Sequence, residues 1–216
     1  MTSESEVQRI ETTRIILDER FNQPSFDARL RWLNPPPTCH LDSAASMLVL
    51  RPASETDFWQ QTRYGFRADN GHFLFTEITG DFTLATKVRF HPVHQYDQAG
   101  LMVRVGPLCW LKTSVEYEPH GTARLGVVVT NYGFSDWSVQ DFPREANEVC
   151  LRIRKQALDF IVEFAPDEHG DWNMMRMAHL HIDDNAPLSC GLYACSPKGG
   201  GFRAEFHFLN IVRPLA

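Results

Sequence analysis

Two glutamates at alternate positions, Glu116 and Glu118, form the residue pair in this sequence best suited to acid–base chemistry. Glycoside hydrolases place two carboxyl groups around the bond that they cleave. On a strand, side chains two positions apart share a face and stand about 6.5–7 Å apart. This spacing does not by itself distinguish a retaining from an inverting hydrolase. Glu116 is the candidate catalytic residue, while Glu118 precedes a Pro-His-Gly turn and could equally be a solvated strand end.

Two histidines at alternate positions, His179 and His181, could ligate zinc or another transition metal, and Asp183 and Asp184 follow them. No third histidine stands at a supporting spacing, and such a pair is more often an ordinary surface feature of a strand. The sequence contains no nucleophile elbow, phosphate-binding loop or dinucleotide-binding fingerprint. We therefore expect neither a metal nor a cofactor.

Strands must position these residues, because nearly every segment after residue 20 alternates apolar and polar side chains with period two. Turn sequences such as Asn70-Gly71 and the glycine-rich segment 197–201 separate the segments. Short strands without alternating helices predict an all-β fold, an antiparallel β-sandwich. The segment 54–62 is the best candidate for a short helix or turn. The clearest strand segments are 82–90, 98–105, 110–117, 123–130, 148–155, 158–164, 172–180, 189–195 and 202–211.

The parity of each position assigns it to one face of its sheet, because one face of every strand packs on the opposite sheet. In the segment 98–105 the odd positions, from Ala99 to Val105, are apolar and are assigned to the core. The even positions of this segment and of 110–117 mix amide, aromatic and charged groups. If these strands share a sheet with 123–130, 148–155 and 172–180, the non-core face collects Gln98, Met102, Arg104, Trp110, Lys112, Glu116, Thr130, Arg152 and Arg176.

This mixture of side chains is typical of a sugar site, where flat aromatic groups stack on apolar ring faces and fixed polar groups bind hydroxyls. The alternative is a polar outer face with incidental ion pairs such as Lys112–Glu116. A second aromatic cluster, at 131–138, places Asp136 and Trp137 where one strand ends and the next begins. An exposed tryptophan there is costly unless it packs over the sandwich edge or binds a ligand.

The length of 216 residues predicts a single domain over 1–216, with residues 1–19 as an N-terminal extension or edge strand. The net charge of −6 disfavours nucleic-acid and anionic-membrane partners. The sequence shows no secretory signal and no apolar run long enough to span a membrane. Five cysteines without a C-x-x-C pair predict reduced thiols in a cytoplasmic protein, although Cys190 and Cys195 could close a hairpin disulfide. The oligomeric state stays open.

Five segments, 57–75, 80–88, 96–118, 127–138 and 191–209, resemble in that order the domain family named after the regulation-of-enolase protein. The resemblance spans roughly residues 20–212 and implies a concanavalin A-like jelly-roll sandwich. That fold hosts lectins and glucanases whose ligands lie across the concave sheet. Laminarinase-type enzymes of the fold carry E-x-D-x-E on one strand, whereas 116–118 reads only Glu-Tyr-Glu, so no hydrolase activity is implied. The family's block pattern includes Gln98, Lys112, Glu116, Asp136 and Trp137.

Three functions remain open at this point. One is an enzyme acting on glycosides, a hydrolase or lyase, in which cations near Glu116 would keep it ionised and favour a base. Another is a regulatory protein-interaction module of carbohydrate metabolism. We favour the third, a module whose partner is a carbohydrate or a related polar or anionic small molecule. Its predicted contacts are Trp110 or Trp137 for stacking, Gln98, Glu116 and Asp136 for hydroxyls, and Arg104, Lys112 and Arg176 for a carboxylate or phosphate.

Overall fold

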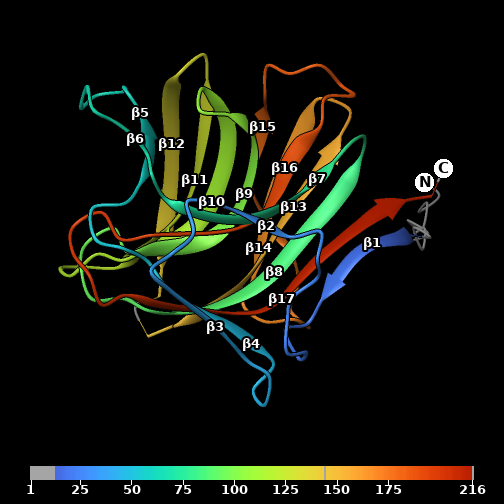
Figure 1. Cartoon of the computed structure of the whole chain (residues 1–216). Coiled ribbons are helices and arrows are strands. Elements are labelled where there is room, and N and C mark those ends of the chain that lie inside the picture. Colours follow the sequence, from blue (N-terminus) through green and yellow to red (C-terminus); the bar gives the residue numbers. More distant parts are fainter. Residues whose placement is uncertain (1–12, 144, 216) are drawn as a thin grey trace, which may run out of the picture.

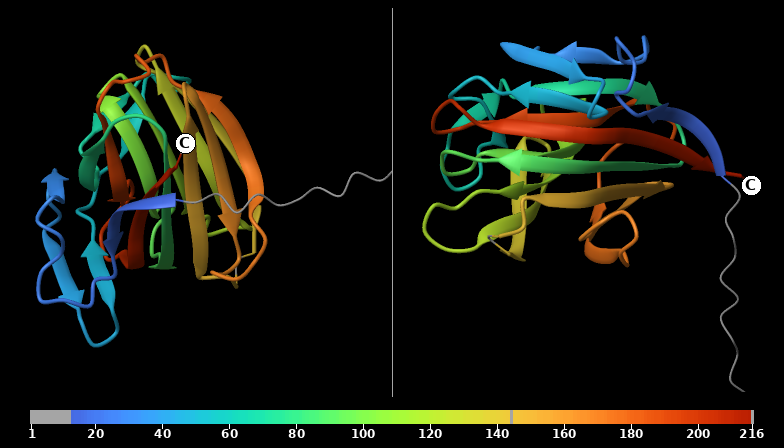
Figure 2. Two further views of the ribbon diagram at one scale, coloured as in Figure 1. Left: turned by 90° about the vertical axis from the view of Figure 1, so that its right-hand side faces the viewer. Right: turned by 90° about the horizontal axis from the view of Figure 1, so that it is seen from below.

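The computed structural model describes residues 13–143 and 145–215, which form two antiparallel sheets packed face to face and contain no helix (Figure 1). The first sheet has eight strands. Seven of them lie in the spatial order β15 (Asn173–His179), β14 (Asp159–Ala165), β13 (Glu148–Gln156), β8 (Phe82–His91), β17 (Arg203–Pro214), β4 (Met47–Arg51) and β3 (Thr38–Asp42). The eighth, β1 (Thr13–Glu19), also pairs with β17. The second sheet has seven, in the order β12 (Phe134–Phe142), β11 (Ala123–Asn131), β10 (Cys109–Glu116), β9 (Gln98–Gly106), β16 (Leu188–Cys195), β7 (His72–Ile78) and β2 (Arg31–Leu33). Both views in Figure 2 place β3 and β4 at one edge of the molecule.

The main core lies between the two sheets, and alternate apolar side chains of each strand enter it. In β8, Phe82, Leu84, Thr86 and Val88 are buried, while the residues at the alternate positions are only partly covered. In the second sheet, Leu101 of β9 and Leu111 of β10 belong to the same core and are fully buried. Full burial of each such side chain stabilises the fold by about 1.5–3 kcal/mol. The alternation visible in the sequence is therefore the pattern that holds the sandwich together.

The antiparallel sandwich predicted from the sequence is confirmed, and all nine predicted strand segments are strands. One local prediction holds only in part, and another is wrong. The segment 54–62 contains no helix but has turn positions at Glu55 and Thr62, and between them lies the short strand β5 (Phe58–Gln60), whose apolar side chains pack against the second sheet. Val105 is 48% exposed and not in the core, because Gly106 pairs with Cys109 and Arg104 with Trp110, which leaves Val105 as the unpaired residue of an irregularity in the β9–β10 ladder.

The assumption that all the polar strand faces share one sheet is also wrong. Strands β13 and β15, which carry Arg152 and Arg176, belong to the first sheet. Arg152 donates a hydrogen bond of 2.7 Å to Glu163 of β14, and its guanidinium lies 4.1 Å from the centre of the Trp172 ring. Parity assigns a residue to one face of its own sheet but carries no information about which strands are neighbours. Residues of two different sheets were therefore assigned to the face of a single sheet.

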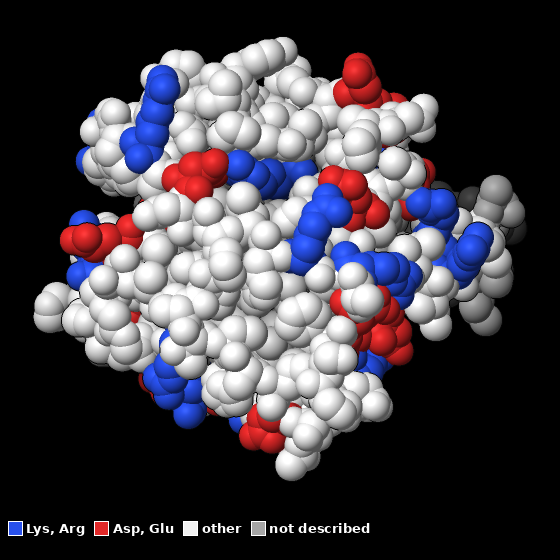
Figure 3. Space-filling model, in the orientation of Figure 1, with Lys and Arg blue, Asp and Glu red and all other residues white. Residues whose placement is uncertain are grey.

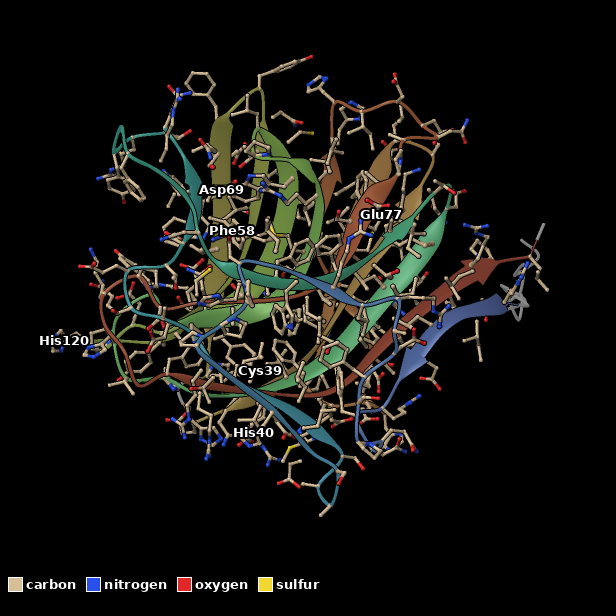
Figure 4. All side chains as sticks on the ribbon, viewed as in Figure 1. Cys39, His40, Phe58, Asp69, Glu77 and His120 are labelled. Atoms are coloured by element: carbon tan, nitrogen blue, oxygen red, sulfur yellow. The ribbon has the colours of Figure 1, made fainter. Side chains whose placement is uncertain are left out.

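Residues 54–70 form a flap over the second sheet, on the face that points away from the main core and is called the outer face below. The flap contains β5 and β6 (Arg67–Asp69), which pair with each other and with neither large sheet. Figure 4 labels Phe58 and Asp69 on the flap, beside the strands of the second sheet. Phe58 is fully buried and makes edge contacts with Trp110 and Tyr193, with ring centres 6.4 and 6.3 Å apart. A second apolar cluster thus fills the centre of the outer face.

Candidate functional site

A pocket with a volume of 190 Å³ opens beside the flap on the outer face of the second sheet. Its floor is made by Gln98 of β9 and by Lys112 and Glu116 of β10. Glu116 lies directly opposite Gln98 in the antiparallel register, and Lys112, four positions earlier, points to the same face. Strand geometry alone therefore brings these three polar groups together. The pocket is lined by Asp57, Trp59, Tyr64, Phe66, Tyr96, Gln98, Lys112, Glu116, Val128, Trp137, Pro197 and Lys198.

Lys112 is the centre of a buried polar network on the pocket floor. Its Nζ donates hydrogen bonds to Gln98 Oε1 at 2.8 Å and to Asp57 Oδ1 at 3.2 Å. The Tyr193 hydroxyl donates to the same Gln98 oxygen at 3.1 Å, and Gln98 Nε2 donates to the Tyr96 carbonyl. Burial is the largest single influence and by itself would lower the pKa of Lys112, but the charges of Asp57 and Glu116 and the hydrogen bond to Asp57 act together against it and hold that pKa above its ordinary value. Lys112 therefore stays cationic while only 2% exposed.

Glu116 is the carboxyl group with an unusual environment. It is 7% exposed, and among the described residues no side chain donates a hydrogen bond to it. Burial raises its pKa to about 7, and the nearby carboxylates Asp57 and Glu118 add to the rise, against a lowering by Lys112. The expectation that neighbouring cations keep Glu116 ionised is wrong, because desolvation exceeds the effect of the single lysine. Glu116 is thus close to half protonated at neutral pH.

The second carboxyl group of the pocket is Asp57 from the flap, and not Glu118. Asp57 lines the pocket together with Glu116 and is paired with Lys112. Glu118 accepts a hydrogen bond of 2.9 Å from Gln95 and is not part of the pocket lining. The two carboxyl groups that share the pocket come from segments about sixty residues apart, so their pairing was not visible in the sequence.

Aromatic side chains of the flap make one wall of the pocket. The Trp59 ring centre lies 6.0 Å from that of Tyr64 and 6.4 Å from that of Phe66, and the Trp59 indole nitrogen donates to the Thr62 carbonyl. Tyr64 is 55% and Phe66 46% exposed. Trp137 of β12 lines the same pocket. Partly exposed rings facing a polar floor are the arrangement that binds the apolar faces of sugars.

Two loops make a second wall and bring Tyr96, Pro197 and Lys198 to the pocket. Buried Asp97 joins these loops. Its carboxylate accepts hydrogen bonds from the backbone amides of Val93 and His94 at 2.7 and 2.8 Å, and another from the Ser196 hydroxyl of the second loop. Carboxylates that accept several hydrogen bonds fix the local backbone firmly. The loops are therefore held as one wall, with the Lys198 side chain at the rim.

The structure brings four of the eight predicted site residues to the pocket, namely Gln98, Lys112, Glu116 and Trp137. The other four lie outside its lining. Arg104 is fully engaged by Asp69 of the flap, with two hydrogen bonds of 2.7 and 2.8 Å. Trp110 is 0% exposed beneath Phe58 and cannot stack on a ligand. Asp136 and Arg176 form an ion pair with each other at 3.2 Å.

Asp136 and Trp137 differ because consecutive strand positions face opposite ways. In β12, Trp137 pairs with Val128, whose side chain lines the pocket, while Asp136 pairs with Val129 of the main core. Asp136 therefore meets Arg176 of the first sheet at the side of the sandwich. The residues that sequence reasoning missed belong to the flap and the loops, and the clustering of aromatics at 57–66 was the signal that could have indicated them.

The other candidate sites are less developed. The rings of His179 and His181 lie 4.9 Å apart, with Tyr132 beside His181. Within residues 13–143 and 145–215, no three potential ligands gather closely enough to hold a metal ion. All five cysteines are free. In the same described ranges no helix is long and apolar enough to cross a membrane. On the face shown in Figure 3, acidic and basic side chains are interspersed.

The two antiparallel sheets form a concanavalin A-like jelly-roll sandwich, with a polar and aromatic pocket on one outer face. The chain belongs to the family described as "Protein of unknown function (DUF1349)", whose sequence profile matches residues 32–214. It is 34% identical over 184 residues to "Regulation of enolase protein 1" of Saccharomyces cerevisiae. The aligned residues cover 85% of this chain and 89% of the yeast protein. The family resemblance seen in the sequence is thus confirmed.

Two solved structures show how far the fold extends. A functionally unknown protein from Saccharomyces cerevisiae superposes with a TM-score of 0.79 at 33% identity, over 88% of this chain and 98% of that one. A xylan β-1,4-xylosidase from Bacillus halodurans C-125 superposes with a TM-score of 0.72 at 15% identity, over 91% of this chain. The chain spans only 39% of that xylosidase, and at such low identity the likeness shows the fold alone.

Proposed function

We propose that this protein binds a carbohydrate or a related polar or anionic metabolite in the pocket beside the flap. The observation that carries the proposal is the convergence of Gln98, Lys112 and Glu116 beneath aromatic walls. Five free cysteines support a cytoplasmic setting, where thiols stay reduced.

The hydrogen bonds already made inside the pocket indicate which groups would meet a ligand. Both polar ends of Gln98 are engaged by other protein groups, so its role is to orient Lys112 and Tyr193. The Glu116 carboxyl has no such partner among the described side chains and is available to ligand hydroxyls. Exposed Lys198 adds a positive charge at the rim, which suits a carboxylate or phosphate. Trp59, Tyr64, Phe66 and Trp137 supply the stacking surface.

A thermal-shift series with neutral sugars, sugar acids and sugar phosphates tests this function. A ligand at a hundred times its Kd stabilises a protein by about 2.7 kcal/mol, which raises the melting temperature of a chain of this size by about 5–10 °C. We expect at least one compound to do so. Glu116→Ala is expected to lose about half of that shift through a roughly ten-fold loss of affinity, whereas Glu118→Ala keeps it. If no compound raises the melting temperature, or the two variants respond alike, the pocket does not bind these ligands.

A second candidate function is catalysis on a glycosidic bond. It is favoured by the different surroundings of the two carboxyl groups in the pocket. Glu116 has a pKa near 7 and can hold a proton, while Asp57 is paired with cationic Lys112. A buried carboxyl group that holds a proton is the form that a general acid requires. Turnover of xylobiose or cellobiose, whose sugar leaving groups must be protonated as they depart, is expected to fall at least about 100-fold in Glu116→Gln, with ligand binding retained. Equal turnover in the variant and the wild type rules Glu116 out as the acid.

A further inference from the structure

We infer that the pocket takes a small saccharide, or one or two terminal units of a longer chain, and excludes the interior of a polysaccharide. This inference rests on the proposed carbohydrate-binding function and specifies its ligand class. On the outer face of the second sheet, an open groove would let a polymer run across successive strands. In this protein that groove is filled.

The flap occupies the middle of the outer face with apolar side chains. Phe58 is 0% and Trp59 9% exposed, and they pack in one cluster with Met102 of β9, Trp110 of β10 and Tyr193 of β16. These three strand residues are themselves fully buried. A sugar chain crossing from β10 to β16 would have to displace this whole cluster. Among the described residues, the polar floor of the pocket comes from β9 and β10, with Val128 of β11 and Trp137 of β12 beside it.

Two ion pairs hold the flap in this position. Asp57 at its start binds Lys112, and Asp69 at its end binds Arg104 through both carboxylate oxygens. The flap is also joined to the β11–β12 hairpin, because the backbone amide of Gln60 donates a hydrogen bond to the Ser135 hydroxyl. Both lysine and arginine partners are nearly inaccessible, with side chains 3% and 9% exposed. Contacts at both ends and in the middle make the flap a fixed wall.

The remaining space is small and has a second wall. The loops that carry Tyr96 and Lys198 line the same pocket as the flap and are joined through Asp97 and Ser196. The volume between the walls is 190 Å³, below the range of about 300–1,000 Å³ that is usual for clefts holding drug-sized ligands. A cavity bounded by fixed walls on two sides and of this volume suits one or two sugar rings.

Isothermal titration with a length series tests the inference on the intact protein. The probes are glucose, xylose and glucuronic acid, followed by β-1,4-linked gluco- and xylo-oligosaccharides of two to six units. We expect affinity to reach its plateau at one or two units and to change less than about three-fold from two to six. A gain of ten-fold or more between two and six units overturns the inference while leaving carbohydrate binding intact. If none of the probes binds while a sugar phosphate raises the melting temperature, the inference fails and the proposed function stands; if no compound of either set binds, the proposed function itself fails.

A matched pair of tyrosine variants tests where on the protein the ligand binds. Tyr64 lies on the pocket wall and is 55% exposed, whereas Tyr132 on the β11–β12 hairpin is 74% exposed and lies outside the pocket lining. Both are surface residues whose loss the fold tolerates. Tyr64→Ala is expected to weaken binding about three- to ten-fold, by the same factor for two-unit and six-unit ligands, and Tyr132→Ala to leave it unchanged. A loss in Tyr132→Ala that grows with ligand length would show a chain running outside the pocket and would overturn the inference.

Discussion

Lys112→Met is expected to lower the free energy of unfolding by about 3 kcal/mol, because it leaves the Asp57 carboxylate without its buried cation. The expected loss is at the lower end of the range of about 3–5 kcal/mol for a broken buried ion pair, since the Asp57 side chain remains 18% exposed. The Gln98 oxygen also loses its shortest hydrogen bond, at 2.8 Å. Urea denaturation monitored by circular dichroism measures the effect.

The same substitution at Lys198 is the control, because that side chain is exposed at the pocket rim. Its expected effect is within about 0.5 kcal/mol. Adding Asp57→Asn to Lys112→Met removes the unpaired charge and is expected to recover part of the loss, with a coupling of about 1–3 kcal/mol in the double-mutant cycle. If Lys112→Met costs no more than Lys198→Met, the buried network does not hold the flap to the sheet.

Glu116→Gln is expected to stabilise the protein at pH 8 and to remove part of the pH dependence of its stability. The pKa of Glu116 is raised from 4.5 to about 7 in the folded protein, so the folded state binds this proton more tightly than the unfolded state. The stabilising effect of the proton is therefore complete below pH 4.5 and is lost as the pH rises through about 7. The shift corresponds to about 3 kcal/mol, and the neutral amide avoids this loss.

Urea denaturation of wild type and variant at four pH values from 5 to 8 checks this expectation. The difference between the two should grow with pH in favour of Glu116→Gln, up to about 3 kcal/mol above pH 7. Glu118→Gln, two positions along the chain, is the matched control and should follow the wild type. Parallel stability profiles for wild type and Glu116→Gln would show that the Glu116 carboxyl is ionised at neutral pH like an ordinary glutamate.

A buried carboxyl group that weakens the fold at neutral pH is typical of a functional site. Glu116 and Lys112 are also the residues for which sequence reasoning worked, because period-two alternation places them on the same face of one strand. Gln98 follows from the same parity, and the antiparallel register with β10 places it opposite Glu116. The sequence was therefore sufficient to predict which residues of a strand share a face.

Sequence reasoning failed where the outcome depends on contacts between distant segments. Trp110 has the parity of the pocket floor, yet Phe58, fifty-two positions earlier, covers it completely. Arg104 has the same parity and is engaged by Asp69 of the flap. Asp57, the second carboxyl of the pocket, could not be matched to Glu116 because nothing in strand periodicity predicts where a flap folds. Burial likewise decided the pKa of Glu116, and burial depends on the whole tertiary structure.

The five tryptophans allow one measurement to test the central claim that the pocket beside the flap binds the ligand. Trp59 and Trp137 line the pocket, Trp110 lies beneath the flap, and Trp172 packs against Arg152 of the other sheet. In a ¹H–¹⁵N spectrum, the best-binding sugar of the thermal series is expected to shift the indole signals of Trp59 and Trp137 in proportion to saturation and to leave that of Trp172 in place. Unchanged signals for Trp59 and Trp137 at saturating sugar, or a shift confined to Trp172, would contradict the account.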